Sequence, residues 1–178
     1  TNEGNADMST SCPKLHIAAI GLEKVIPNYD CLAVFQRMLC RAGTGQPTTT
    51  YTSHFRKARP TAEKMHIILV DNGRSEWIGN PDHWEVLKCI RCGSCMNTCP
   101  VYRRSGGYSY SYFIPGPVGI NLGMLRNHQQ HSGNVSACTL CLSCQTVCPV
   151  KIDLGDQIYK WRQQLDEFGT ANSEKKMM

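Results

Sequence analysis

One spacing of cysteines occurs twice in this chain: Cys89-x-x-Cys92-x-x-Cys95-x-x-x-Cys99-Pro100 and Cys138-x-x-Cys141-x-x-Cys144-x-x-x-Cys148-Pro149. The chain has 178 residues and eleven cysteines, so these two runs account for most of its thiols. Secreted disulfide scaffolds are usually shorter and vary the distances between their cysteines. Repeated close spacing predicts metal ligation instead, and we expect a reducing, cytoplasmic location.

The spacing favours two [4Fe–4S] clusters. Three thiolates two residues apart can hold three corners of a cubane, and the fourth cysteine of such a run ligates the other cluster in proteins with two runs. The proline after each fourth cysteine has no N–H and fixes the chain as it leaves the site. The predicted ligand sets are Cys89, Cys92, Cys95 and Cys148 for one cluster, and Cys138, Cys141, Cys144 and Cys99 for the other.

Clusters that exchange ligands in this way must lie close together, and closeness is what predicts electron transfer between them. Small neighbours at Gly93, Ser94 and Ser143 leave room for backbone N–H groups to point at the sulfurs and tune the potential. Zinc is the main alternative metal. It would use paired Cys-x-x-Cys units with four ligands and leave half of the cysteines unused.

The two runs lie in the second half of a chain whose first half has a different pattern. Residues 1–75 favour an α/β arrangement, with strands expected at 15–20, 48–53 and 65–70. A helix is expected to begin at a cap-like segment, residues 27–30, and to end at Gly43.

A second domain is expected over residues 76–169, followed by a frayed tail at 170–178. Asn80-Pro81 favours the start of a short helix that runs into the first cysteine run. Residues 152–168 predict a helix with Ile158, Trp161 and Leu165 on one stripe. The spacer between the runs is longer than in ferredoxins built from β-hairpins, which favours a mainly helical two-cluster domain. The fold class is therefore α+β.

Composition and net charge exclude few classes of function. Net charge is +5 and the basic residues are scattered, so the sequence does not require nucleic acid. No apolar run approaches the length that spans a bilayer.

Several long motifs resemble the iron–sulfur subunit of the bacterial lactate-utilisation system. They comprise residues 88–104, 105–107, 114–117 and 148–154 around the cysteines. Upstream, residues 21–27 and 49–56 look like the lactate-utilisation domain that precedes the ferredoxin part.

This resemblance implies a subunit that acts with a cysteine-rich iron–sulfur subunit and a second lactate-utilisation-domain subunit. Together they would oxidise L-lactate to pyruvate in the cytoplasm. Residues 1–75 would be the C-terminal part of an α/β lactate-utilisation domain, with the fold of sugar-isomerase and CoA-transferase relatives. We therefore expect a fragment of a longer protein. No flavin, nicotinamide, Walker or Ser–His–Asp pattern is present, so no complete substrate site and no catalytic residue are expected in it.

Two other functions remain open. The chain could belong to a heterodisulfide-reductase-like or fumarate-reductase-like enzyme, although residues 1–75 lack the four-cysteine spacing of a plant-type [2Fe–2S] domain. From another class, it could be a non-redox protein with structural or sensory clusters.

Some residues outside the runs have weaker signals. Cys12 lies outside the family pattern, and Cys31 and Cys40, also outside it, are expected to be buried in the first helix. The loop at residues 2–5 could form a pocket with Glu23, but a plain turn is the simpler interpretation. The remaining candidates are Arg103 and Arg104 as a docking or potential-raising pair, Tyr108, Tyr110 and Tyr112 as shielding side chains, and His128 and His131, which lack a third metal ligand.

Overall fold

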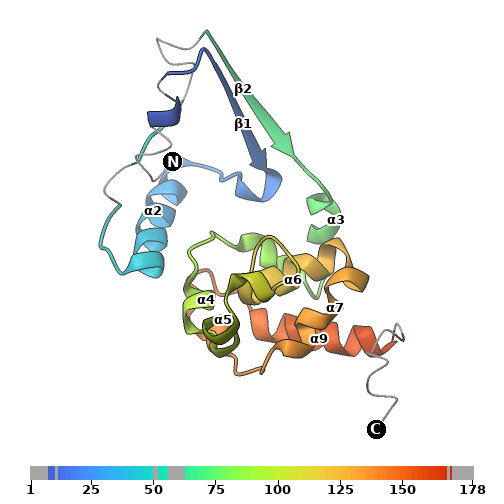
Figure 1. The fold of residues 1–178 in the computed structure, drawn as a ribbon. Helices are drawn as coiled ribbons and strands as arrows, with labels where there is room; N and C mark the ends of the chain where they lie inside the picture. The colour runs from blue at the N-terminus through green and yellow to red at the C-terminus, as the bar shows by residue number, and fades with distance from the viewer. Residues whose placement is uncertain (1–7, 11, 50–51, 56–62, 168, 170–178) are drawn as a thin grey trace. The chain divides into compact units, whose positions relative to one another are not determined.

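The computed structural model describes residues 8–10, 12–49, 52–55, 63–167 and 169. The chain divides into two compact units, Thr1–Arg74 and Ser75–Met178. Figure 1 traces the elements of each unit.

The first unit contains a parallel pair of strands. β1 (Leu15–Gly21) pairs with β2 (Lys64–Val70), and the register runs from Leu15 opposite Lys64 to Gly21 opposite Val70 (Figure 1). Both strands were expected and are confirmed. The strand expected at 48–53 is wrong for its described residues, which are not in a strand, while residues 50–51 lie outside the described part. Threonine-rich stretches form strands only where a partner and a packing surface meet them.

Helix α2 (Tyr29–Thr44) follows the short 3₁₀ helix η1 (Leu22–Lys24). Its expected cap is confirmed, because Asn28 Oδ1 accepts a hydrogen bond from the N–H of Cys31 at 2.9 Å. The helix ends at Gly45 rather than at Gly43. Gly45 has φ +74° and donates its N–H to the Arg41 carbonyl, a left-handed cap that suits glycine.

All of the elements described in the second unit are helices, in agreement with the mainly helical domain that was expected. Its elements are α3 (Arg74–Ile78), η2 (Trp84–Lys88), α4 (Ser94–Thr98), α5 (Pro100–Ser105), η3 (Gly107–Ser109), α6 (Gly116–Arg126), α7 (His128–Ala137), α8 (Ser143–Thr146) and α9 (Leu154–Glu167). Arg74, the first residue of α3, is assigned to the first unit. Helix α6 is the central one and packs against α4, α7 and α9 (Figure 1).

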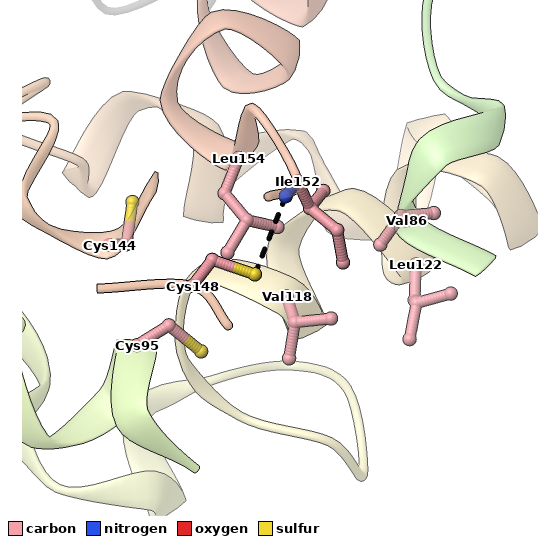
Figure 2. Close-up of a cluster of buried hydrophobic side chains, with 8 residues drawn as sticks. All are labelled: Val86, Cys95, Val118, Leu122, Cys144, Cys148, Ile152 and Leu154. Carbon is pink, nitrogen blue, oxygen red and sulfur yellow. Dashed lines mark hydrogen bonds between the residues drawn. The ribbon is translucent and has the colours of Figure 1, made fainter. Parts of the chain in front are cut away.

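Two hydrophobic clusters lie on the two sides of α6. The first comprises Val86, Cys95, Val118, Leu122, Cys144, Cys148, Ile152 and Leu154 (Figure 2). The second comprises Ile120, Met124, Val135, Ile158, Trp161 and Leu165. The expected stripe on α9 is therefore confirmed as buried. Three cysteines of the runs form part of the core, and Cys89 and Cys138 pack against it.

The segment before the first cysteine run differs from its prediction. Asn80 does act as a cap, since its Oδ1 accepts hydrogen bonds from the N–H groups of Asp82 and His83 at 3.1 and 3.2 Å. The chain then turns into the 3₁₀ helix η2 instead of an α-helix. Val86 and Leu87 are buried there, so packing against the core decides the local geometry.

Candidate metal centre

The two cysteine runs have the same backbone conformation. In the first run Arg91 and Gly93 have φ of +61° and +84°, and in the second Leu140 and Leu142 have φ of +52° and +60°. A short helix starts directly afterwards in both runs, α4 at Ser94 and α8 at Ser143. Two left-handed residues per run bend the chain so that its first three cysteines face a common space.

The first of these spaces is a cavity of about 100 Å³. Its cysteines are Cys89, Cys92, Cys95 and Cys148, three from the first run and the last one of the second. Apolar side chains, among them Val118 and Ile152, complete its wall. Figure 2 shows the sulfurs of Cys95 and Cys148 pointing to the same side, towards Val118, with Cys144 apart from them.

The second space is smaller, about 20 Å³, and has the reciprocal composition. It is lined by Cys138, Cys141 and Cys144 from the second run and by Cys99 from the first. The structure thus brings together the two sets of four cysteines that the spacing assigns to separate clusters. Ligation of a metal by these residues stays a prediction.

Backbone N–H groups point at sulfur in both sites. The four N–H···Sγ contacts are each 3.4 Å long and join Arg91 to Cys89, Ile152 to Cys148, Leu140 to Cys138 and Tyr102 to Cys99. The contact between Ile152 and Cys148 is drawn in Figure 2. Such donors stabilise metal-bound thiolates and tune their electronic properties. The sequence predicted donors near the small residues, but these four positions were missed because nothing in their side chains marks them.

Serine hydroxyls add a second matched pair of contacts. The thiol of Cys92 donates to Ser94 Oγ at 3.5 Å, and the thiol of Cys141 donates to Ser143 Oγ at 3.6 Å. When Cys141 is ionised, hydrogen bonds donated by the Ser143 side chain and backbone stabilise the thiolate and lower the pKa of Cys141. The two runs therefore repeat each other in side-chain contacts as well as in backbone shape.

Burial has the opposite effect on the pKa of the two buried cysteines at the start of the short helices, Cys95 and Cys144. It raises the pKa of Cys95 and of Cys144 to about 12, and the neighbouring thiolates of Cys89 and Cys138 add to this rise. Four thiolates in one apolar cavity repel each other unless positive charge lies among them. The donor set therefore suits a cationic metal centre with sulfur ligands, which is the chemistry of an iron–sulfur cluster.

One buried donor makes no regular hydrogen bond in the protein. The hydroxyl of Tyr110 is buried without a hydrogen-bond partner of normal geometry. Its ring packs against the second hydrophobic cluster, which Cys138 and Leu140 also contact. Burial and the adjacent Cys99 raise the pKa of Tyr110, so the phenol keeps its proton. A sulfur-rich metal group in the second cavity would give this O–H, which lies beside Cys99, a hydrogen-bond acceptor.

The other tyrosines and the histidines have ordinary surroundings. Tyr112 packs on Phe113 with ring centroids 4.3 Å apart, whereas Tyr108 is fully exposed, so the shielding expected of Tyr108 is wrong. His131 Nδ1 lies 2.7 Å from Ser111 Oγ. Within the described part of the chain, no group of three or more His, Cys, Asp or Glu side chains is close enough to hold a single metal ion, and the cysteines of each cavity surround a wider space.

The remaining candidates lie away from the cavities or on the surface. Arg103 and Arg104 are exposed in the last turn of α5. Cys12 is exposed, Cys31 is half-buried and Cys40 is buried, so burial in α2 is confirmed for Cys40 and partial for Cys31.

Glu23 pairs with Arg74 within the first unit. The Arg74 Nε donates to Glu23 Oε2, and the Glu23 side chain is nearly buried. Burial alone would raise the pKa of Glu23, but a backbone hydrogen bond and Arg74 outweigh it and the pKa is lowered. The loop at residues 2–5, expected beside it, lies outside the described residues.

No helix among the residues that the structure describes combines the length and the apolar character needed to cross a membrane.

Two domain families match the chain. Residues 1–76 match the LUD domain, and residues 85–152 match the 4Fe-4S dicluster domain. Together they span most of the sequence, and the first match ends two residues after the boundary between the two structural units.

Relatives with curated names match almost the whole chain. "Lactate utilization protein B" from Shouchella clausii is 40% identical over 98% of this chain and 38% of the relative. The "Uncharacterized electron transport protein YkgF" from Escherichia coli is 40% identical over 99% of this chain and 38% of the relative. "Lactate utilization protein B" from Bacillus pumilus is 42% identical over 94% and 36%.

The chain thus spans about two fifths of the length of these relatives. No solved structure matches it.

Proposed function

For a chain that joins an LUD domain to a 4Fe-4S dicluster domain, we propose the binding of two [4Fe–4S] clusters and the passage of electrons between them. The first cluster is held by Cys89, Cys92, Cys95 and Cys148, and the second by Cys138, Cys141, Cys144 and Cys99. When bound, such clusters take up and release single electrons at potentials set by their surroundings.

The observation that carries this proposal is the pair of reciprocal cavities. Each gathers four cysteines, three from one run and one from the other. The crossed fourth ligand keeps the two sites adjacent, because α4 and α8, which carry Cys95 and Cys144, pack directly on each other. Close centres are what rapid electron transfer needs.

The surrounding residues position and protect the sites. Val118, Ile152 and Leu154 are each at most 4% exposed and exclude water from the first cavity. The N–H groups of Arg91, Leu140, Tyr102 and Ile152 are already aimed at sulfur, so the loops need little rearrangement on binding.

At the level of the whole protein, we infer an electron-transfer subunit of a complex that oxidises L-lactate to pyruvate in the cytoplasm. Its partners would be a cysteine-rich iron–sulfur subunit and a second subunit with an LUD domain. The names of the relatives support this role, since two refer to lactate utilization and one to electron transport. No residue of this chain is assigned to lactate chemistry.

Anaerobic reconstitution with iron and sulfide tests the two clusters. We expect about eight iron atoms per chain and EPR signals of two interacting centres after reduction. The matched control is Cys12→Ser, which removes an exposed thiol outside the runs and should leave the iron content unchanged. Four or fewer iron atoms in the unaltered chain, or bound zinc, would contradict the proposal.

Combined variants test the crossed ligation. A chain with Cys89, Cys92 and Cys95 changed to serine keeps only the second site, and about four iron atoms should remain. Adding Cys99→Ser should then remove them, while adding Cys148→Ser should not. The reverse result would mean that each run binds its own cluster.

The lactate role has a separate test. Lactate added to the chain together with its partner subunits should reduce the clusters, as seen by loss of visible absorbance. Clusters that stay oxidised, while dithionite reduces them, would argue against lactate oxidation but not against electron transfer. Clusters that cannot be cycled without loss of iron would support a structural or sensory role.

A further inference from the structure

The two cavities repeat each other in backbone but differ in the side chains around them. The first is lined, besides its cysteines, by apolar residues, glycine and proline, together with Ser94 and the exposed Arg91. At the second, Cys99 lies beside the Tyr110 hydroxyl, and the Cys138 carbonyl accepts a hydrogen bond from Arg162 of α9.

Tyr110 is placed next to Cys99 by two contacts. Its ring lies 6.0 Å from that of Tyr102, whose N–H donates to Cys99 Sγ, and it packs against the hydrophobic cluster that Cys138 also contacts. The buried hydroxyl has no hydrogen-bond partner of normal geometry in the protein, and Cys99 lies beside it. The cost of burying such a donor falls only if it finds an acceptor, and sulfur of the second site is the one at hand.

Arg162 holds the other side of the same site. Its Nε and Nη2 donate to the Val135 carbonyl at 3.2 and 3.1 Å, and Nη2 also donates to the Cys138 carbonyl at 2.5 Å. The guanidinium is half-buried and stays charged at any physiological pH. It therefore fixes the start of the second run and places a positive charge beside Cys138.

Both features favour the reduced form of a metal centre. Reduction adds a negative charge, which a hydrogen bond to sulfur and a nearby cation stabilise, more strongly in a protein interior than in water. The exposed Arg91 at the first site is screened by solvent and has a weaker effect.

We propose that Tyr110 and Arg162 raise the reduction potential of the cluster at Cys99, Cys138, Cys141 and Cys144 above that of the cluster at Cys89, Cys92, Cys95 and Cys148. Tyr110 donates a hydrogen bond to Cys99 Sγ, and Arg162 is a positioning residue that acts through the Cys138 loop and its charge. The first electron to enter the pair then resides at the second site. This inference rests on the proposed two-cluster function.

A potentiometric titration of the reconstituted chain with dithionite, followed by EPR, tests it. Two one-electron steps are expected in the unaltered chain. Tyr110→Phe should lower the equilibrium constant of the step at the higher potential about tenfold. For one electron this lowers that potential by about 59 mV. Arg162→Gln should lower the same step, and both variants should keep about eight iron atoms.

Three further variants separate potential from folding. Tyr108→Phe changes a fully exposed tyrosine and should shift neither step. Arg91→Gln should leave the higher step in place. Arg162→Lys keeps the charge, and the potential of its higher step should lie between those of the wild type and of Arg162→Gln. The role of Arg162 therefore remains testable if the glutamine variant loses iron.

The outcomes distinguish a failure of this inference from a failure of the proposed two-cluster function. Two reducible steps that Tyr110→Phe leaves unchanged or shifts equally would overturn the inference alone. The same holds if Tyr110→Phe and Arg162→Gln shift different steps. A chain without two reducible steps would overturn the two-cluster function and this inference with it.

Discussion

At the scale of single residues, His83 is the titratable group whose burial has the clearest effect on stability. Its side chain is 0% exposed and stacks on Trp161 with ring centroids 3.7 Å apart. Burial lowers the pKa of His83 to about 4, despite a hydrogen bond with Gln164 and the nearby Asp82. The folded protein therefore keeps this imidazole neutral at pH values where an unfolded chain would protonate it.

We expect His83 to make stability fall as the pH falls. Below its unfolded pKa of 6.5 the unfolded state binds a proton that the folded state does not, so the free energy of unfolding decreases down to about pH 4 and then levels off. The full effect is on the order of 3 kcal/mol. Denaturant unfolding of the wild type and of His83→Gln at pH 7 and pH 5 measures it.

The variant serves as the control for other acid-sensitive groups. Since the cysteine sites are the same in both proteins, the difference between wild type and His83→Gln should shrink from pH 7 to pH 5. A difference that does not change with pH would show that His83 titrates normally.

Single residues also show how much of the candidate site could be predicted from the sequence. The two sets of cysteines followed from their spacing, and both sets are brought together. Gly93 at φ +84° fits a left-handed turn, but Leu140 and Leu142 take the same conformation against their intrinsic preference. Tyr110 and Arg162 could not be assigned to the second site, because their contacts connect segments far apart in the chain.

At the scale of elements, α6 depends on a close approach that only glycine allows. A Cβ built on Gly119 would lie 1.7 Å from the Ile114 carbonyl oxygen, which belongs to the backbone and cannot easily move. We expect Gly119→Ala to displace α6 from the core and to destabilise the chain by several kcal/mol. Thermal unfolding and the iron content after reconstitution measure this loss.

Gly133 provides the matched control. It lies in α7, is exposed, and a Cβ built on it meets nothing within 4 Å. Gly133→Ala should therefore stabilise the chain by about 0.5–1 kcal/mol through helix propensity alone. Equal effects of the two substitutions would contradict the packing assigned to Gly119.

The elements were predicted to different degrees for a physical reason. Helices α2 and α9 have one apolar face and a polar one, so their periodicity is visible in the sequence. Helix α6 is buried from Gly116 to Met124, so it has no such period. The 3₁₀ form of η2 and the failed strand at 48–53 both depend on tertiary packing, which local sequence does not encode.

At the scale of the whole molecule, burial is unevenly distributed. Among the described residues, Cys40 is the one core residue of the first unit, whereas α6 and α9 are rich in residues that are at most 6% exposed. The sheet residues Ile17, Ile67 and Leu69 are each more than half exposed. Few buried apolar contacts mean low local stability.

Hydrogen exchange followed by mass spectrometry tests this difference. Amides in β1 and β2 should exchange at least about tenfold faster than those in α6 and α9, because local opening of the sheet exposes little further apolar surface. Similar protection in all four elements would mean that the exposed apolar faces of the strands are covered in solution.

The reciprocal cavities also bear on how the protein is made. Residues leave the ribosome in order, so Cys89, Cys92 and Cys95 emerge long before Cys148, which lines the same cavity. Cys99 likewise waits for Cys138, Cys141 and Cys144. Neither site can collect its four sulfurs until the second run has been synthesised. With the proposed ligand sets, metal insertion would come late in biosynthesis, and a chain truncated before residue 138 would carry thiols but no complete site.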